Sequence, residues 1–311
     1  MHDLIVVGGG PAGITATVYA INRHLDALLL SDELGGKSNH HMQLRGMAGF
    51  EPITGEEIVR KFRSQVEYLE HARLADRATL VEAGDLPDGR PGFRVTTDGG
   101  SALESLALIV ASGVSPRLAG CPGEVEFRGR GVSYSAASHA PLYWGRDAAV
   151  LGSGREALRA AADLATLAAR VYLIAPDGFP ASSRLLDRVR SLPNVSVMPG
   201  HRLLGLGGGE YVAEASVRDP DGAVHVLPIQ GLFVEAGVCP NTGFLSGACE
   251  LDVAGHVVVD GSGATSRPGL FAAGDVTSQC AGQMLVAVGE GARGAVSARR
   301  YPLEVGPAPL G

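Results

Sequence analysis

The chain has 311 residues, more than one ordinary single-core domain of about 100 to 200 residues, so two domains are the starting expectation. Hydrophobic residues make up 45% of the chain and charged residues 19%, and the mean hydropathy is +0.14, a composition that excludes disorder as the main state. The formal net charge of −7 and the pI of about 5.7 exclude a nucleic-acid partner held by a basic surface.

The first predicted elements are a strand, a glycine turn and a helix. Leu4–Val7 is a short apolar run, Gly8-Gly9-Gly10-Pro11-Ala12-Gly13 follows it, and a helical pattern continues to about Asn22. The glycines and the proline interrupt the apolar stretch, and no basic segment precedes it, so it is neither a membrane span nor a signal peptide. We therefore expect a cytoplasmic protein that makes no contact with a membrane.

The same arrangement begins again at Gly152, 144 positions after Gly8. Ala148–Leu151 leads into Gly152-Ser153-Gly154-Arg155-Glu156-Ala157, and a helical stretch continues to about Ala169. Each copy is followed by a further strand and so begins a β-α-β unit. In this turn the first glycine permits a tight bend, the second lets the backbone approach a pyrophosphate, and the third, or an alanine, lets helix and strand pack closely.

Further elements complete two α/β domains. Capping-box spacing and apolar periodicity predict a helix from about Gly55 to His71, and a closing helix is expected from about Gly282 to Arg300. The remaining predicted strands are Ala27–Leu30, Thr79–Glu82, Phe93–Thr97, Leu106–Val110, Val171–Ile174, Val195–Met198, Tyr211–Val217, Val224–Leu227, Leu232–Ala236, Val257–Val259 and Leu270–Ala273. Asp219-Pro220-Asp221-Gly222 is strong turn chemistry, so the two strands beside it should form a hairpin.

In this order the motifs resemble those of the low-molecular-weight thioredoxin reductase family of two-domain flavoproteins. The segments that carry the resemblance are Gly8 to Gly13, Gly35-Gly36, Ala111-Ser112-Gly113, Gly131-Val132-Ser133-Tyr134 and Thr265 to Asp275. The resemblance implies an α/β fold of two dinucleotide-binding, Rossmann-like domains. Residues 1–116 and 244–311 would form a discontinuous FAD-binding domain, and residues 117–243 a smaller inserted domain of the NAD(P)-binding type. It also implies a homodimer.

By this resemblance the two ends of the chain bind FAD. Asp275 would face the ribityl hydroxyls of the flavin, and the backbone near Gln283 and Met284 would face its pyrimidine edge, where a helix N-terminus stabilises the charge of a reduced flavin. Asp32 is the acid expected on the adenine ribose, with Ser31 as its competitor. The expected FAD-binding residues are Gly8, Gly10, Pro11, Ala12, Gly13, Asp32, Gly36, Ala111, Gly113, Gly274, Asp275, Gln283 and Met284.

The chain departs from the family at its redox site. The family's reductases carry a Cys-x-x-Cys pair where this chain has Ser135-Ala136-Ala137-Ser138-His139. Serine hydroxyls cannot cycle between dithiol and disulfide, so relay through this site is excluded. Either Ser135 and Ser138 cap the helix that starts there, or they line a pocket over the flavin with His139 and act as the catalytic residues.

The cysteines support the same exclusion. The chain has Cys121, Cys239, Cys249 and Cys280, which lie far apart in the sequence. Their spacing fits neither a disulfide scaffold nor a zinc site, and we expect no metal.

A second departure concerns the pyridine nucleotide. Family members that use NADPH carry arginines just after the strand that matches Val171–Ile174, whereas this chain has Ala175-Pro176-Asp177-Gly178. The Asp177 carboxylate would repel a 2′-phosphate and accept hydrogen bonds from a ribose diol, which favours NADH over NADPH. Gly152, Gly154 and Asp177 are therefore the candidate NAD(P) residues. The alternative is that this domain has lost nucleotide binding and that ferredoxin or flavodoxin reduces the flavin.

Three functions remain open at this point. The first is an FAD-dependent oxidoreductase that passes electrons directly between the flavin and a small-molecule substrate or a redox carrier protein such as ferredoxin. The second is a ferredoxin or flavodoxin to NAD(P) reductase, which is less favoured because the basic phosphate clamp is missing. The third is a flavin-binding, redox-responsive protein without turnover, suggested by the loss of both the disulfide and the clamp.

Overall fold

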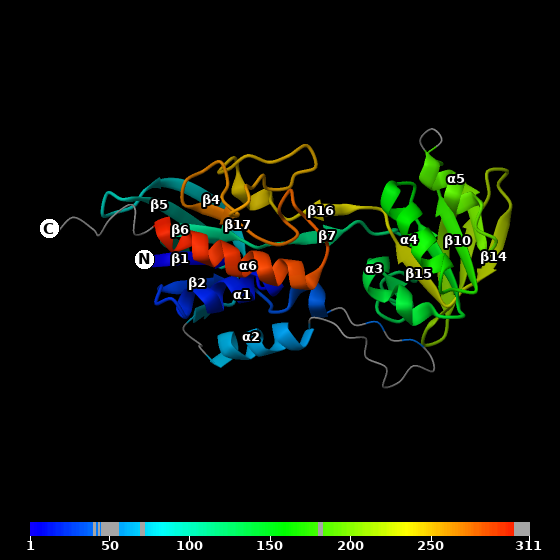
Figure 1. The fold of residues 1–311 in the computed structure, drawn as a ribbon, viewed down its shortest axis with the longest axis horizontal. Helices are drawn as coiled ribbons and strands as arrows, with labels where there is room; N and C mark the ends of the chain where they lie inside the picture. Colours follow the sequence, from blue (N-terminus) through cyan, green and yellow to red (C-terminus); the bar gives the residue numbers. More distant parts are fainter. Residues whose placement is uncertain (40–41, 43, 45–55, 69–71, 180–182, 302–311) are drawn as a thin grey trace. The chain divides into compact units, whose positions relative to one another are not determined.

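The computed structural model describes residues 1–39, 42, 44, 56–68, 72–179 and 183–301, and these residues divide into two compact units (Figure 1). Unit 1 consists of the described residues of Met1–Asn39, Pro52–Ser115 and Cys239–Gly311. Unit 2 consists of those of Pro116–Val238, together with Met42 and Leu44. No helix in the described part of the chain has the length and apolar character needed to span a membrane.

A largely parallel sheet forms the centre of unit 1. Its strands follow the order β3-β2-β1-β6-β5-β4, and β17 pairs with β6. The strands are β1 (His2–Val7), β2 (Ala27–Leu30), β3 (Arg73–Leu74), β4 (Ala78–Asp85), β5 (Pro91–Thr97), β6 (Ala102–Val110) and β17 (Leu270–Ala272). β1 pairs in parallel with β2 and β6, whereas β4, β5 and β6 are antiparallel. The central strands are buried on both faces, which is why they are continuous apolar runs.

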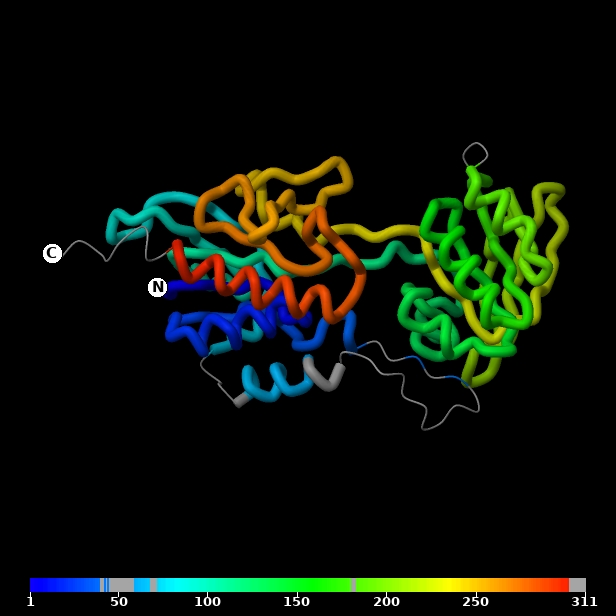
Figure 2. The backbone as a smooth tube through the Cα atoms, in the orientation of Figure 1, coloured from blue at the N-terminus to red at the C-terminus, as the bar shows by residue number. Residues whose placement is uncertain are grey.

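Successive residues of β1 contribute to two different cores of unit 1. Leu4 and Val6 belong to a cluster with the helices α1 (Pro11–Ile21), α2 (Glu56–Tyr68) and α6 (Met284–Ala298). Ile5 and Val7 belong to a cluster with β4 and β5. The first and last helices, blue and red in Figure 2, lie side by side, and a side chain at Gly291 of α6 would collide with the carbonyl oxygen of Ala12 in α1. The first and last helices of the described chain therefore pack directly against each other.

Unit 2 has a parallel sheet of its own, with the strand order β11-β10-β9-β15-β8. Its strands are β8 (Val132–Ser133), β9 (Asp147–Leu151), β10 (Arg170–Ala175), β11 (Val195–Pro199) and β15 (Gly231–Val234). Helices α4 (Arg155–Ala165) and α5 (Arg184–Arg190) share one core with this sheet. The second core is shared with an antiparallel sheet of β12 (Arg202–Gly208), β13 (Val212–Arg218) and β14 (Val224–Pro228).

Short elements complete the described chain. They are β7 (Val114–Pro116), β16 (Val238–Pro240), α3 (Ala136–His139), and the 3-10 helices η1 (Gly36–Asn39), η3 (Ala140–Tyr143) and η4 (Gly243–Leu245). β7 pairs with β16, and each of these two strands contains a boundary between the units.

The structure confirms the predicted α/β fold class, because the sheet of each unit contains parallel strands and includes one strand that is followed by a glycine turn and a helix. The hairpin is also confirmed, since β13 and β14 are antiparallel and the Asp219 N–H donates to the carbonyl of Ala223. The predicted strand Val257–Val259 is wrong. Val257 forms only isolated bridges, to Leu251 and Thr277, because no full neighbouring strand lies beside it.

The helices α4, α2 and α5 agree with the sequence predictions to different degrees. α4 ends at Ala165 rather than near Ala169, and β10 begins soon afterwards, at Arg170. α2 lies inside the range predicted for it, and both predicted ends of that helix fall outside the described residues. Helix α5 was not predicted; the Ser183 hydroxyl caps it by accepting from the N–H of Leu186.

Candidate functional site

The first glycine loop joins β1 to α1 in unit 1, and close contacts require three of its four glycines: Gly8, Gly9 and Gly13. Gly8 has φ +112°, and a Cβ there would collide with the carbonyl oxygen of Ala111 at the end of β6. A Cβ at Gly13 would collide with the carbonyl oxygen of Gly8. By contrast, a Cβ at Gly10 would meet no atom within 4 Å. The loop is therefore packed tightly on one side and open at its middle glycine.

The N-terminus of α1 is suited to an anion. Gly10 is its N-cap, no side chain caps it, Pro11 occupies the first turn, and that turn contains no acidic residue. Gly36 closes over this loop, because a Cβ on Gly36 would lie 3.2 Å from the Cα of Gly10. Backbone N–H groups with no side-chain partner, beside open space and at the positive end of a helix, are the donor set that a pyrophosphate needs. These residues fit the phosphates of a dinucleotide.

Asp32 follows β2, where an acid for a ribose was expected. Its carboxylate is half exposed and accepts from the N–H of Glu33 and from Arg77, whose Nη2 lies 2.7 Å from Oδ2. The hydrogen bond from Arg77 is the main reason that the pKa of Asp32 is lowered. The competing Ser31 is buried and donates to the carbonyl of Glu33, 2.6 Å away. Asp32 is thus the more accessible of the two, and it already has a cationic partner.

The turn that carries Asp275 is anchored by residues far away in the sequence. The N–H of Gly274 donates to Glu290 Oε2 at 2.7 Å, and burial raises the pKa of that carboxyl. Asp275 Oδ2 lies 2.9 Å from the Nζ of Lys37, a residue 238 positions earlier in the chain. Neither Lys37 nor Glu290 was predicted as a site residue, because neither contact has a local signal.

The remaining FAD candidates of unit 1 lie at ends of elements. The Ala111 N–H donates to the carbonyl of Val7, and Gly113 has φ +65° and accepts from the N–H of Asn241. Gln283 is the N-cap of α6 and makes no side-chain capping bond, while Met284 is the first residue of that helix. The N-terminus of α6 therefore has backbone donors without a side-chain cap, as the interpretation of a charge-stabilising helix end requires.

Ser135 and Ser138 of unit 2 form a direct pair. The Ser135 hydroxyl donates to Ser138 Oγ at 3.0 Å. His139 Nδ1 lies 2.8 Å from Ser133 Oγ, at the end of β8. The structure thus places two of the candidate catalytic residues, Ser138 and His139, on α3 and the third, Ser135, at its N-cap, and it adds Ser133 to them.

The capping interpretation of these serines is wrong. Ser135 occupies the N-cap position of α3, but its side chain makes no capping bond. The carboxylate of Glu235 accepts from the N–H of Ala136 instead, at 3.0 Å. Since Glu235 lies 99 residues away in the sequence, local spacing could not have identified it. The two hydroxyls are therefore not engaged in holding the helix end.

Three of the four cysteines are poorly suited to supply a reactive thiolate in place of the missing pair. Burial raises the pKa of Cys121 to about 11, with a contribution from Glu124. Burial also raises the pKa of Cys249, and burial and the Asp275 carboxylate together raise the pKa of Cys280. A raised pKa disfavours the thiolate, which is the nucleophilic form.

The second glycine loop repeats the plan of the first. A Cβ at Gly152 would collide with the carbonyl oxygen of Glu235 at the end of β15, whereas a Cβ at Gly154 would meet no atom within 4 Å. Gly154 is the N-cap of α4 and has no side-chain cap. The first turn of α4 differs from that of α1, since it contains Glu156, which pairs with Arg159. Gly154, which corresponds to Gly10 of the first loop, is therefore again the glycine that lies beside open space.

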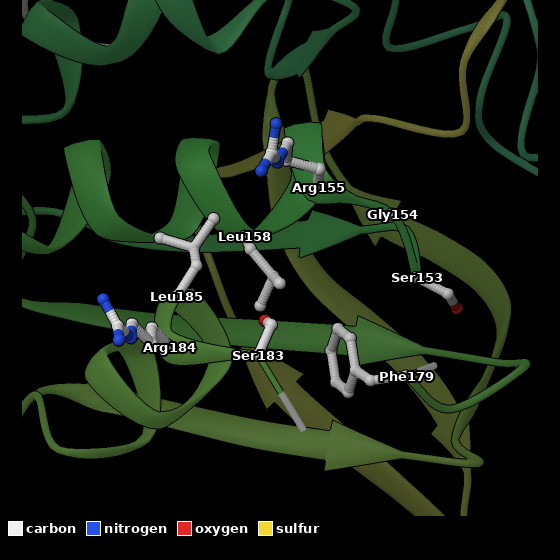
Figure 3. Close-up of a pocket in the computed structure, with 8 residues that line it drawn as sticks. All are labelled: Ser153, Gly154, Arg155, Leu158, Phe179, Ser183, Arg184 and Leu185. Atoms are coloured by element: carbon white, nitrogen blue, oxygen red, sulfur yellow. The ribbon is translucent and has the colours of Figure 1, made fainter. Parts of the chain in front are cut away.

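A cavity of about 360 Å³ lies at this second loop (Figure 3). Among the described residues it is lined by Ser153, Gly154, Arg155, Leu158, Phe179, Ser183, Arg184 and Leu185. Asp177 adjoins it, because its N–H donates to Ser153 Oγ at 3.3 Å. Two arginines, Arg155 and Arg184, are among these lining residues. The carboxylate and the two exposed guanidiniums offer recognition of both a ribose and phosphates.

Comparison with known proteins agrees with this geometry. Residues 2–291 match the model of the family described as pyridine nucleotide-disulphide oxidoreductase. The chain is 32% identical over 302 residues, 96% of its length, to an alkyl hydroperoxide reductase subunit of Staphylococcus aureus, and 35% identical over 303 residues, 95% of its length, to the corresponding protein of Pseudomonas putida. It spans only 59% and 57% of these two relatives.

The solved structures confirm the expected likeness to thioredoxin reductases. The thioredoxin reductase of Streptococcus pyogenes superposes with a TM-score of 0.86 at 27% identity, covering 98% of each chain. That of Giardia duodenalis gives 0.83 at 26% identity, covering 96% of this chain and 98% of the other.

Proposed function

Because the chain belongs to the pyridine nucleotide-disulphide oxidoreductase family, we propose that it is an FAD-dependent oxidoreductase that works without a protein disulfide. The observation that carries the proposal is the hydroxyl pair of Ser135 and Ser138, in a chain whose two glycine loops both keep an open middle glycine. Bound FAD would supply the redox chemistry by taking up and releasing an electron pair. The protein's residues would then bind and orient the FAD and protect it from solvent, and no cysteine sulfur would take part in the electron transfer.

FAD would be held by unit 1. The N–H groups at the start of α1 would bind its pyrophosphate, with Gly8, Gly10, Pro11, Ala12, Gly13 and Gly36 shaping the loop. Asp32 would accept from the adenine ribose and Asp275 from the ribityl chain, and Ala111, Gly113, Gln283 and Met284 would border the ring. These assignments are supported by the open space at Gly10, by the half-exposed carboxylate of Asp32 and by the uncapped N-terminus of α6.

A pyridine nucleotide would be held by unit 2, which we take as the inserted domain expected over residues 117–243, with residues 1–116 and 244–311 as the FAD-binding domain. Gly152 and Gly154 would receive its pyrophosphate, and Asp177 would accept from a ribose diol. The hydrogen bond between Asp177 and Ser153 supports this role, since it fixes the carboxylate-bearing turn beside the loop. We propose NADH as the preferred donor, while Arg155 and Arg184 are the groups through which NADPH could compete.

His139, Ser135 and Ser138 would bind the electron acceptor and move its protons. The hydroxyls can donate and accept, and an imidazole exchanges a proton near neutral pH. The acceptor would be a small molecule or a redox carrier protein such as ferredoxin, and the active form a homodimer. The relatives from Staphylococcus aureus and Pseudomonas putida are alkyl hydroperoxide reductase subunits and are longer than this chain. Components of an alkyl hydroperoxide reductase system are therefore the first acceptors to test.

The test is an anaerobic titration that follows the visible absorbance of the flavin. We expect NADH to bleach the band, and NADPH to do so less efficiently. Bleaching by NADPH alone would contradict the role of Asp177. Reduction by ferredoxin but by neither nucleotide would select the carrier-linked alternative, and a bound flavin that no donor reduces would select the non-catalytic one.

A further inference from the structure

A lysine ammonium lies beside the proposed FAD site, and none of the roles assigned above uses it. Lys37 belongs to η1, directly after Gly36, which closes over Gly10 of the first glycine loop. Its Nζ lies 2.9 Å from Asp275 Oδ2. The pair thus links two segments at the same end of α1, because a Cβ on Gly274 would lie 3.0 Å from the Cβ of Ala12.

The ion pair between Lys37 and Asp275 reduces electrostatic repulsion at the proposed FAD site. The Asp275 side chain is only 16% exposed, and the partly buried carboxyl of Glu290 is close enough for the Asp275 charge to contribute to its raised pKa. A pyrophosphate at the start of α1 would bring two more negative charges next to them. Like charges at short range in a partly desolvated site repel strongly. Without a cation, Asp275 would oppose the cofactor that it is meant to orient.

A lysine at position 37 is unusual for this chain, which has very few lysines. Arginine supplies 24 of its 26 basic residues, and the only lysines are Lys37 and Lys61. An ammonium is a compact charge with three donors, so it can hold Asp275 with one and still offer two to other oxygens. The Lys37 side chain is 45% exposed, which leaves those donors accessible.

We propose that Lys37 is the counter-cation of the FAD site: it neutralises and orients Asp275 and donates to the phosphates of the bound cofactor. This inference rests on the proposed FAD site. It makes Lys37 a cofactor-positioning residue, and it requires a positive charge at this position rather than bulk.

The first test needs no substitution, because the chain has only two lysines. Wild-type protein with bound FAD and protein freed of FAD are acylated with an amine reagent, and both lysines are followed by mass spectrometry. Lys61 lies on α2 with an exposed side chain and serves as the internal reference. We expect FAD to slow the acylation of Lys37 several-fold and to leave Lys61 unchanged. Equal rates at Lys37 with and without FAD would overturn the inference.

The second test measures FAD affinity at two salt concentrations. Lys37→Met should raise the Kd for FAD by roughly tenfold or more, as expected for the loss of a charge-assisted hydrogen bond. Lys37→Arg should restore most of the affinity, and Lys61→Met should have no effect. Added salt should weaken the binding of FAD to the wild type more than to Lys37→Met, because the variant has lost an attraction that salt screens.

The role of Lys37 and the FAD site itself can be overturned separately. Wild-type affinity in Lys37→Met would overturn the role of Lys37 and leave the FAD site standing. A wild-type protein that binds no FAD would overturn the proposed function and this inference with it.

Discussion

The hydroxyls of Ser135 and Ser138 share a hydrogen bond with an Oγ to Oγ distance of 3.0 Å. The two residues are three positions apart, and the helix end between them is held by Glu235 rather than by either serine. The two hydroxyls are therefore available to contact a substrate. The two side chains also lie close enough together that cysteines in their place could form a disulfide. Each of these properties leads to a test.

Cysteines at both positions should form a disulfide. Two side-chain atoms 3.0 Å apart need only a small movement to reach a sulfur to sulfur bond of about 2.05 Å. After mild oxidation, Ser135→Cys with Ser138→Cys should show two fewer free thiols in denaturant than its reduced form. The single variant Ser135→Cys is the control and should lose none. An oxidised double variant that keeps all its thiols would show that the two side chains do not meet as described.

The two glycine loops can be tested separately through their open positions. Gly10→Ala adds a methyl group that meets no protein atom within 4 Å, so the FAD-free protein should keep its Tm, but the variant should bind FAD roughly tenfold or more weakly. Gly154→Ala should keep its flavin and lose reduction by NADH. Flavin content, Tm and the rate of reduction check both. A Gly10→Ala protein with full FAD affinity would mean that the cofactor does not approach this loop.

Asp177 should control the choice of nucleotide. Removing its carboxylate in Asp177→Ala takes away a charged acceptor for a ribose diol, so kcat/KM for NADH should fall by about tenfold or more. The rate with NADPH should stay the same or rise, because the repulsion of a 2′-phosphate is lost. Glu210→Ala removes an exposed carboxylate of the same unit that does not line the cavity, and it should change neither rate. Equal losses with both nucleotides would contradict the assignment.

The carboxyl of Glu290 should make stability depend on pH. Burial raises its pKa, so the folded protein binds this proton more tightly than the unfolded chain does. The stabilisation is therefore complete below the ordinary carboxyl pKa of about 4.3 and is lost as pH rises through the raised value. Glu290→Gln keeps an acceptor for the Gly274 N–H and removes the titration.

Thermal unfolding between about pH 4 and pH 7 measures this effect. The wild-type Tm should fall relative to that of Glu290→Gln as pH increases, and the variant should be the more stable of the two at pH 7. The exposed Glu156, replaced in the same way, is the control. A wild-type Tm that rises relative to that of Glu290→Gln as pH increases would show that the folded protein favours the ionised carboxylate.

The local parts of this fold could be predicted from sequence. β1, β2, β9 and β10 each contain a run of at least four apolar residues, and the glycines after β1 and β9 mark turns that few other residues could form. The strand prediction over Val257–Val259 was wrong because an apolar run forms a strand only where another strand pairs with it. Among the described residues, Val257 forms only isolated bridges. β12 was missed because Gly205, Gly207 and Gly208 weaken the strand pattern, and the pairing that forms it comes from β13.

The site was predictable only in outline. The loops and Asp275 belong to motifs, but their partners come from elsewhere: Lys37 lies 238 residues from Asp275, and Arg77 lies 45 from Asp32. Such contacts depend on how sheets and helices assemble, and no local spacing encodes them. Arg155 and Arg184 line the same cavity because α4 and α5 pack against the same sheet, and this too has no local signal in the sequence.

The most direct test of the central claim is an anaerobic count of the electrons that the purified protein accepts from dithionite for each bound FAD. A flavin accepts two electrons, and a redox-active disulfide would accept two more. We expect two electrons per FAD, with no further uptake after the visible band has bleached. Uptake of four electrons, or a protein that cannot be reconstituted with FAD, would contradict the account.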